Sequence, residues 1–328
     1  MKYSLYKEIL STRLWNIRRE SGHAFAMSFL DNPKLELHAS DARPDPDEDA
    51  KSHSVFLIKG SDVSAYKKEH PLDFTSETNA DKIALLASKV KVGDAERLER
   101  WGELELDDTV INYIPVTGPI TRNGGGCSYG SMEIRDNLIE TTNIEQVVSH
   151  ILYIDSPGGS SFARNDFKMG IDAVHASGKK VYGLIDGQCH SAALGLACLC
   201  DEVYYVDPND TIGSVGTMAA FRTIKDGTED SVSHSVYHER YSEDSYDKNL
   251  WARNAADGDY ALIDEELKKD SEEFAALVKE CRPKTPDDML HGKDTTCDKA
   301  PYWVNGQSDL TGLIARIIDE HEMAKRKR

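Results

Sequence analysis

The sequence has no run of about 20 consecutive apolar residues, the length that a helix needs to cross a bilayer. Residues 1–7, which read Met-Lys-Tyr-Ser-Leu-Tyr-Lys, lack the apolar segment of a secretory signal. Both absences predict a soluble, cytoplasmic protein without a membrane span.

Positive charge is also scarce. Lys and Arg number 39 against 57 Asp and Glu, which gives a formal net charge of −18. Such a chain repels phosphate backbones, so the composition argues against nucleic-acid binding as the main task. The one cationic run, at 325–328, is read as part of a solvated tail.

Cysteine is infrequent and does not form a metal-binding or disulfide pattern. The six cysteines include no Cys-x-x-Cys pair, which favours reduced thiols. The nearest approach to a ligand set is Cys189, His190, Cys198 and Cys200, whose spacing does not match a zinc ribbon. We therefore expect neither a metal nor an organic cofactor.

The first 107 residues form an N-terminal extension without an identifiable chemical motif. Leu10, Leu14 and Ile17 have helical spacing, and a second helical pattern covers 80–101. A strand is expected at 54–58, after an acidic, proline-containing linker at 41–49. The extension is thus predicted to be mostly helical and of unknown role.

From residue 108 the pattern changes to alternating strands and helices. Strands are expected at 110–116, 151–155, 181–186 and 202–206, and helices at 132–144, 160–176, 191–200 and 259–280. This order predicts an α/β domain over 108–320 with a mainly parallel sheet, followed by a basic tail at 321–328. Sites in such sheets form at the carboxyl ends of strands.

Two segments at such strand ends carry the elements of an acyl-transfer site. Ser191 begins a helix of small residues, and Gly158 and Gly159 follow the strand at 151–155. Glycine amides can approach an oxyanion closely. Alone, the serine would be a helix N-cap and the glycines a turn. Together, they indicate a serine hydrolase.

The serine needs a base. His190 is adjacent in sequence, so its side chain should diverge from that of Ser191, whereas His234 and His238 can return in space. A lysine base must be neutral, which requires lowering a pKa of about 10.4 by about three units, or roughly 4–5 kcal/mol.

Several motifs in order resemble one peptidase family. They are Ser-Pro-Gly-Gly at 156–159, Gly-Gln-Cys-His-Ser-Ala-Ala at 187–193, Asp-Glu-Val-Tyr at 201–204 with Pro208, Thr-Ile-Gly-Ser-Val-Gly at 211–216 and Gly-Leu-Ile at 312–314. This series resembles the signal peptide peptidase A family of Ser–Lys proteases. That family has the caseinolytic-protease/crotonase-like fold, built from repeated β-β-α units.

The resemblance implies a role for each matching residue. Ser191 is then the nucleophile, the amides of Gly159 and Ala192 bind the oxyanion, and Gly158 shapes the turn. In short family members the base lies some fifty to sixty residues beyond the serine.

Lys248 lies 248 − 191 = 57 residues beyond the serine and matches that base, with Lys225 as the alternative. Ser214 matches the serine that orients the lysine amine. The chain departs from the family at His190 and at the pair 192–193, where small or glycine residues are usual.

The sequence therefore predicts an ATP-independent serine endopeptidase that acts on peptides or proteins through an acyl-enzyme. An extended substrate is expected to add as a strand along 158–162, and the resemblance implies a ring-shaped homo-oligomer. The membrane anchor of the family is missing from this sequence, so soluble relatives encoded by phages and integrated elements are the better comparison. Some of these process capsid proteins.

Three alternatives remain open at this stage. One is a Ser–His–Asp peptidase that uses His234 or His238, and another is a crotonase-type enzyme that binds coenzyme A. The third is a non-catalytic scaffold protein that assembles normally when Ser191 is replaced.

Overall fold

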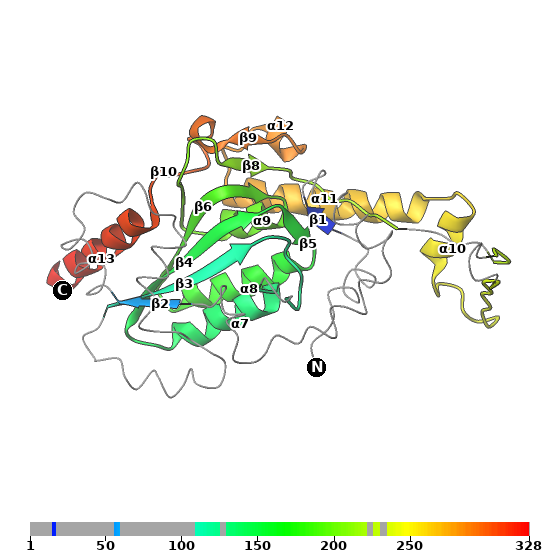
Figure 1. Ribbon diagram of the computed structural model, residues 1–328, viewed down its shortest axis with the longest axis horizontal. Helices are drawn as coiled ribbons and strands as arrows, with labels where there is room; N and C mark the ends of the chain where they lie inside the picture. Colours follow the sequence, from blue (N-terminus) through cyan, green and yellow to red (C-terminus); the bar gives the residue numbers. More distant parts are fainter. Residues whose placement is uncertain are drawn as a thin grey trace.

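A computed structural model describes residues 109–124, 129–221, 226–229 and 235–327 (Figure 1). It also describes two short strands nearer the N-terminus, β1 (Trp15–Ile17) and β2 (Phe56–Lys59). β2 overlaps the strand expected at 54–58. The helix expected at 80–101 and the linker at 41–49 lie outside the described residues.

Ile17, which the helical spacing with Leu10 and Leu14 placed in a helix, is instead in strand β1. Pairing with a second strand, β5 (Gly158–Ser160), accounts for the difference, because tertiary pairing overrides a short periodic pattern.

The remaining elements alternate between strand and helix. They are β3 (Val110–Thr117), α7 (Ser131–Thr142), β4 (Val147–Ser156), β5 (Gly158–Ser160), α8 (Ala163–Ala176), β6 (Lys180–His190), α9 (Ala192–Leu199), β7 (Glu202–Tyr205), β8 (Thr211–Gly213), α10 (Leu250–Ala256), α11 (Ala261–Cys281), α12 (Asp287–Leu290), β9 (Thr295–Thr296), a 3-10 turn (Cys297–Lys299), β10 (Gly306–Gln307) and α13 (Leu310–Lys327).

The main sheet has the strand order β10-β7-β6-β4-β3-β2, with β8 pairing with the end of β6 and β9 pairing with β8. The pairs β3–β4, β4–β6, β6–β7, β6–β8 and β7–β10 are parallel, whereas β2–β3 and β8–β9 are antiparallel. The predicted α/β class with a mainly parallel sheet is confirmed.

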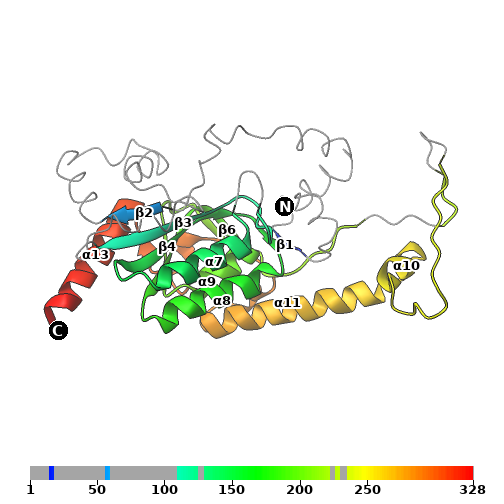
Figure 2. The same cartoon turned by 90° about the horizontal axis from the view of Figure 1, so that it is seen from below.

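Both faces of this sheet are buried, as the apolar strand sequences require. In β3, Ile114 and Val116 face one core, while Ile111 and Tyr113 face another. Helices α7, α8 and α9 cover the first face (Figure 2), and α13 covers part of the second. None of the helices in the described ranges is long and apolar enough to cross a membrane.

Helix α9 is buried along almost its whole length, because its residues are small. It packs against α8, β6 and the C-terminal half of α11. A Cβ on Gly195 would lie 3.3 Å from the ring of Phe274 in α11, so glycine allows the two helices to approach closely. The sequence Ala-Ala-Leu-Gly-Leu-Ala is therefore suited to a central helix.

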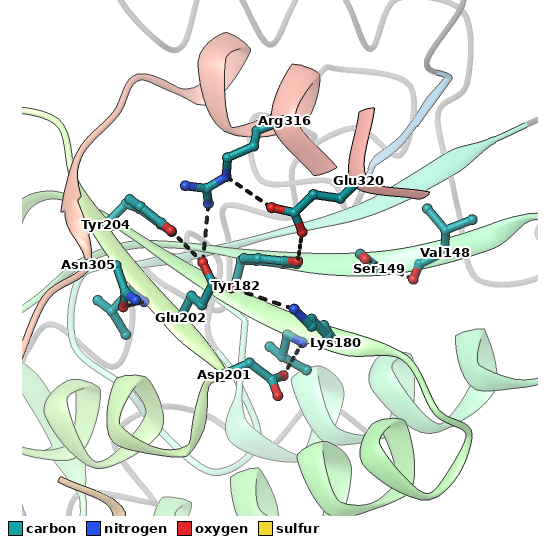
Figure 3. A network of polar contacts seen from close by, with 12 residues as sticks. Val148, Ser149, Lys180, Tyr182, Asp201, Glu202, Tyr204, Asn305, Arg316 and Glu320 are labelled. Carbon is teal, nitrogen blue, oxygen red and sulfur yellow. Dashed lines mark hydrogen bonds and ion pairs between the residues drawn. The ribbon is translucent and has the colours of Figure 1, made fainter. Parts of the chain in front are cut away.

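Helix α13 is fixed on the sheet by a polar network around its apolar face (Figure 3). Arg316 pairs with Glu202 of β7 at 3.4 Å and lies over the ring of Tyr204 at 4.1 Å. Tyr182 of β6 donates to Glu320 at 3.5 Å. The network joins α13 to two neighbouring strands, which supports the sheet edge far from the strand ends that carry the candidate site.

A buried polar network lies between α7 and the sheet. His150 Nδ1 lies 3.0 Å from Asn112 Nδ2, which also donates to Asn137 Oδ1 at 2.8 Å. Because an amide nitrogen only donates, His150 accepts through Nδ1 and is neutral. Burial, followed by the charge of Lys179, lowers the pKa of His150 from 6.5 to about 3.

We predict that His150 makes the fold sensitive to mild acid. Between pH 6.5 and 3 the unfolded chain binds a proton that the folded chain excludes, so stability falls as the pH drops. The slope from this one residue is about 1.4 kcal/mol per pH unit below pH 6.5. Urea unfolding of His150→Asn between pH 5 and 7 should show a shallower dependence than the wild type. The same change at exposed His175 serves as the control, and equal slopes for wild type and His150→Asn would contradict the prediction.

Candidate active site

The two sequence segments predicted to form the site meet at the carboxyl ends of neighbouring parallel strands. Ser156 at the end of β4 is in register with Cys189 near the end of β6. The chain then turns into β5 on one strand and into α9 on the other, and β5 packs against α9. Gly158, Gly159 and Ser191 are therefore brought to the same edge of the sheet, as the sequence predicts.

Ser191 occupies a sharp turn between β6 and α9. Its φ of 53° and ψ of −116° lie in a region that residues with a Cβ rarely adopt. The Ser191 N–H donates to the Gly213 carbonyl at 2.9 Å, and its carbonyl accepts from Gly195 at 2.9 Å. These two bonds hold the strained turn in place.

The Ser191 hydroxyl does not cap the helix. The residue is 1% exposed, and Oγ has no hydrogen-bond partner among the described residues. A buried hydroxyl without a partner carries an unfavourable desolvation energy. Such a group is expected to have a functional reason for its position. Backbone strain and an unused hydroxyl together mark Ser191 as a nucleophile candidate.

Ala192 is the first residue of α9. The N–H groups of a first helical turn have no acceptor within the helix, and the helix dipole favours negative charge there. Ala192 is fully buried beside Ser191. Its amide therefore suits an oxyanion that forms next to the Ser191 hydroxyl.

Gly158 forms the turn between β4 and β5. Its φ of +99° favours glycine, and its N–H donates to Ser156 Oγ at 3.2 Å. Ser156 Oγ in turn donates to the Gly118 carbonyl at 2.6 Å. Gly158 thus shapes the backbone, and its amide is already engaged.

Gly159 is required by a close approach of the backbone. A Cβ at this position would lie 1.8 Å from the Ile120 carbonyl oxygen. Ile120 donates to the Gly158 carbonyl at 2.9 Å and accepts from Ser160 at 2.8 Å. Because backbone groups of successive strand residues point to opposite sides, the N–H and C=O of Gly159 point away from Ile120.

Ser214 lies immediately after the Gly213 carbonyl that holds Ser191. It also has a positive φ, 57°, and its residue is half-buried. Two adjacent residues of the 211–216 motif thus lie at the turn that carries the serine. The base-orienting role stays a prediction.

Lys248 is not brought to Ser191 within one chain. It is exposed and precedes α10, which lies at the outer end of the long helix α11 (Figures 1 and 2). The segment 217–221 accompanies α11 outward, where Phe221 contacts Trp251 with ring centroids 5.6 Å apart. We call residues 217–221, 226–229 and 235–262 the arm.

Of the alternative bases, the structure describes His238. His238 is exposed on the arm and lies 3.3 Å from Asp226. His234 and Lys225 lie outside the described residues.

His190 is part of a buried polar group that the sequence alone does not reveal. Its Nε2 lies 2.9 Å from Thr211 Oγ1, and its Nδ1 lies 3.8 Å from Asp294. The ring therefore points toward β8 and away from the Ser191 side chain, as expected for its neighbour in sequence. Asp294 comes from the segment before β9, too far along the chain for any spacing pattern to indicate it.

Ser156 was likewise not singled out from the sequence. A serine two residues before a glycine often bonds to the backbone of the turn, and this local signal predicts the observed contact with Gly158. Within the described ranges, no group of three His, Cys, Asp or Glu side chains is arranged to hold a metal ion.

Of three comparisons with known proteins, only the comparison with solved structures finds matches. No protein-family model matches the chain. No curated protein matches it either.

Similar solved structures include a ClpP1 mutant from Listeria monocytogenes, with 11% identity and a TM-score of 0.35 over 60% of this chain and 91% of that one. A peptidase from Plasmodium falciparum is 12% identical, with a TM-score of 0.35 over 57% and 89%. An enoyl-CoA hydratase from Shewanella pealeana is 11% identical, with a TM-score of 0.37 over 65% and 69%. At these identities the likeness concerns the fold alone.

The strain at Ser191 predicts an unusual stability order. Ser191→Gly should unfold with a free energy about 1 kcal/mol higher than Ser191→Ala, since glycine relieves the positive φ while both variants lack the hydroxyl. Thermal or urea unfolding measures the difference. An alanine variant as stable as the glycine variant would show that the turn is unstrained.

The contact between Gly159 and Ile120 predicts a large effect of one methyl group. Gly159→Ala should destabilise the protein by more than about 2 kcal/mol, because the neighbouring atom belongs to the backbone and cannot rotate away. Gly183→Ala in β6 is the matched control, since its Cβ would lie no nearer than 3.4 Å to a neighbour. Similar unfolding midpoints for the two variants would refute this packing.

Proposed function

We propose that this protein is an ATP-independent serine endopeptidase of the signal peptide peptidase A type, with Ser191 as the nucleophile. The observation that carries the proposal is the buried Ser191 hydroxyl, which has no hydrogen-bond partner in the part of the chain that the structure describes. It lies at a strained turn, at the same sheet edge as Gly159 and the start of α9. A structural serine would cap the helix, and this one does not.

In the proposed mechanism, the Ser191 hydroxyl attacks the carbonyl carbon of a peptide bond while its proton passes to a neutral lysine amine. The amides of Gly159 and Ala192 donate to the oxyanion that forms. The protonated amine then returns the proton to the leaving nitrogen. Water, deprotonated by the same amine, attacks the acyl-enzyme and releases the second product.

We assign the base role to Lys248 of a second copy of the chain. Within one copy the residue precedes α10 at the outer end of α11 (Figure 2), whereas α9, which follows Ser191, packs against the C-terminal half of α11. The arm also exposes large apolar side chains, which are Val236, Tyr237, Tyr246, Tyr260 and Leu262. Contact with another subunit would bury them and favour the uncharged amine.

The substrate is proposed to be an extended peptide that adds to β5 as a strand. Main-chain hydrogen bonds to residues 158–160 would supply affinity, and the space around Ser191 would select side chains. Capsid processing, as in phage-encoded relatives, is the cellular role that we assign to this activity.

Labelling with a fluorophosphonate probe tests the nucleophile and the base together. Wild-type protein should be labelled at one site, Ser191→Ala should not be labelled, and Lys248→Ala should be labelled at least 100-fold more slowly. Lys268→Ala, an exposed lysine of α11, is the matched control and should label like the wild type. Gel fluorescence and mass spectrometry of the labelled peptide report rate and position.

Each other outcome excludes a part of the proposal. Labelling that survives in Ser191→Ala excludes the nucleophile, and unchanged labelling of Lys248→Ala with loss in His238→Ala selects the histidine alternative. A base supplied by a second copy also requires that a mixture of Ser191→Ala and Lys248→Ala subunits cleave peptide when neither does alone. Failure of that mixture would leave the base within one chain.

A further inference from the structure

A strand from the N-terminal extension, β1, pairs with one edge of β5. β1 pairs antiparallel with β5, with Trp15 opposite Ser160, Asn16 opposite Gly159 and Ile17 opposite Gly158. Figure 1 shows β1, in blue, beside β5 and the start of α9. Residues 15–17 therefore lie where an added substrate strand is proposed to bind.

The register brings the backbone of β1 to a functional amide. The N–H and C=O of Gly159 point away from Ile120, which bonds to Gly158 and Ser160 on the other side. Gly159 therefore faces Asn16, its partner in the register. In such an antiparallel pair the two residues exchange both hydrogen bonds, so the Asn16 carbonyl faces the Gly159 N–H.

We propose that residues 15–17 are an intramolecular ligand that occupies the substrate strand position and closes the active site to other peptides. This inference rests on the proposed function, since Gly159 is there an oxyanion donor. A carbonyl of β1 takes the place next to that amide, so a substrate carbonyl reaches it only after β1 leaves.

The chain length between β1 and the sheet makes such occupancy effective. Residues 18–55 separate β1 from β2, the next strand and a member of the main sheet, so the segment is tethered yet long enough to leave and return. A tethered segment has an effective concentration of about millimolar, which competes with a free peptide present at micromolar levels. Three paired residues form a short strand that such a peptide can displace.

Asn16→Pro in the full-length protein tests the proposal. Proline removes the N–H that faces Gly159 and disrupts the pairing, whereas Asn16→Ala keeps the backbone and is the matched control. Asn16→Pro should react with the fluorophosphonate at least tenfold faster than the wild type, and Asn16→Ala should stay within twofold of it. Equal rates for the three proteins would overturn the proposal.

A peptide added in trans extends the test. A synthetic peptide of residues 11–21 should slow the labelling of Asn16→Pro toward the wild-type rate. This peptide is cationic and the chain is acidic, so a scrambled peptide of the same composition controls for charge. Equal inhibition by both peptides would overturn the specific pairing.

Binding without chemistry separates this proposal from the proposed function. If no Ser191-dependent labelling occurs in any variant, the peptidase assignment fails, and fluorescence anisotropy still reports on the strand. A fluorescent 11–21 peptide should then bind Asn16→Pro at least tenfold more tightly than the wild type or Asn16→Ala. Equal binding, or unchanged hydrogen exchange across residues 156–162 in Asn16→Pro, would reject occupancy of β5 by β1.

Discussion

The turn at Ser191 is the constraint on which the candidate site depends. Holding a residue with a Cβ at this φ and ψ costs about 1–3 kcal/mol of conformational free energy. Contacts with the surrounding residues must offset this cost. They do so through the Gly213 carbonyl on one side and the first turn of α9 on the other. Without this turn, the hydroxyl and the amides at the start of the helix would not share one space.

Close packing at two glycines lies near that turn. Gly159 lies against Ile120, and Gly195 allows α9 to lie against Phe274 of α11. Neither position leaves room for a larger side chain without a shift of the neighbours. Small residues within or next to the two motifs thus serve packing as well as the proposed chemistry.

The sequence predicts those features that depend on local periodicity. The predicted strands at 110–116 and 181–186 and the helix at 160–176 correspond to β3, β6 and α8 within a few residues, because their apolar spacing is regular. The convergence of Gly159 and Ser191 follows from the parallel order of the strands.

The remaining features depend on tertiary structure. β4 begins at Val147, earlier than expected, since Ser149 and His150 are buried in the sheet despite being polar. The three residues of β1 are too few to show the alternating pattern of a strand. The path that takes Lys248 outward is decided by packing along α11. A spacing of 57 residues in sequence does not indicate distance in space.

The shape of the arm has a mechanical consequence. Helix α11 has 21 residues and is about 30 Å long, and only its C-terminal half is held in the core. A rotation of about 5° at its root would displace the far end by about 3 Å, as much as a hydrogen bond is long. For the proposed role of Lys248 near the tip, a neighbouring molecule would have to fix the angle of this helix, and assembly and turnover would then be coupled.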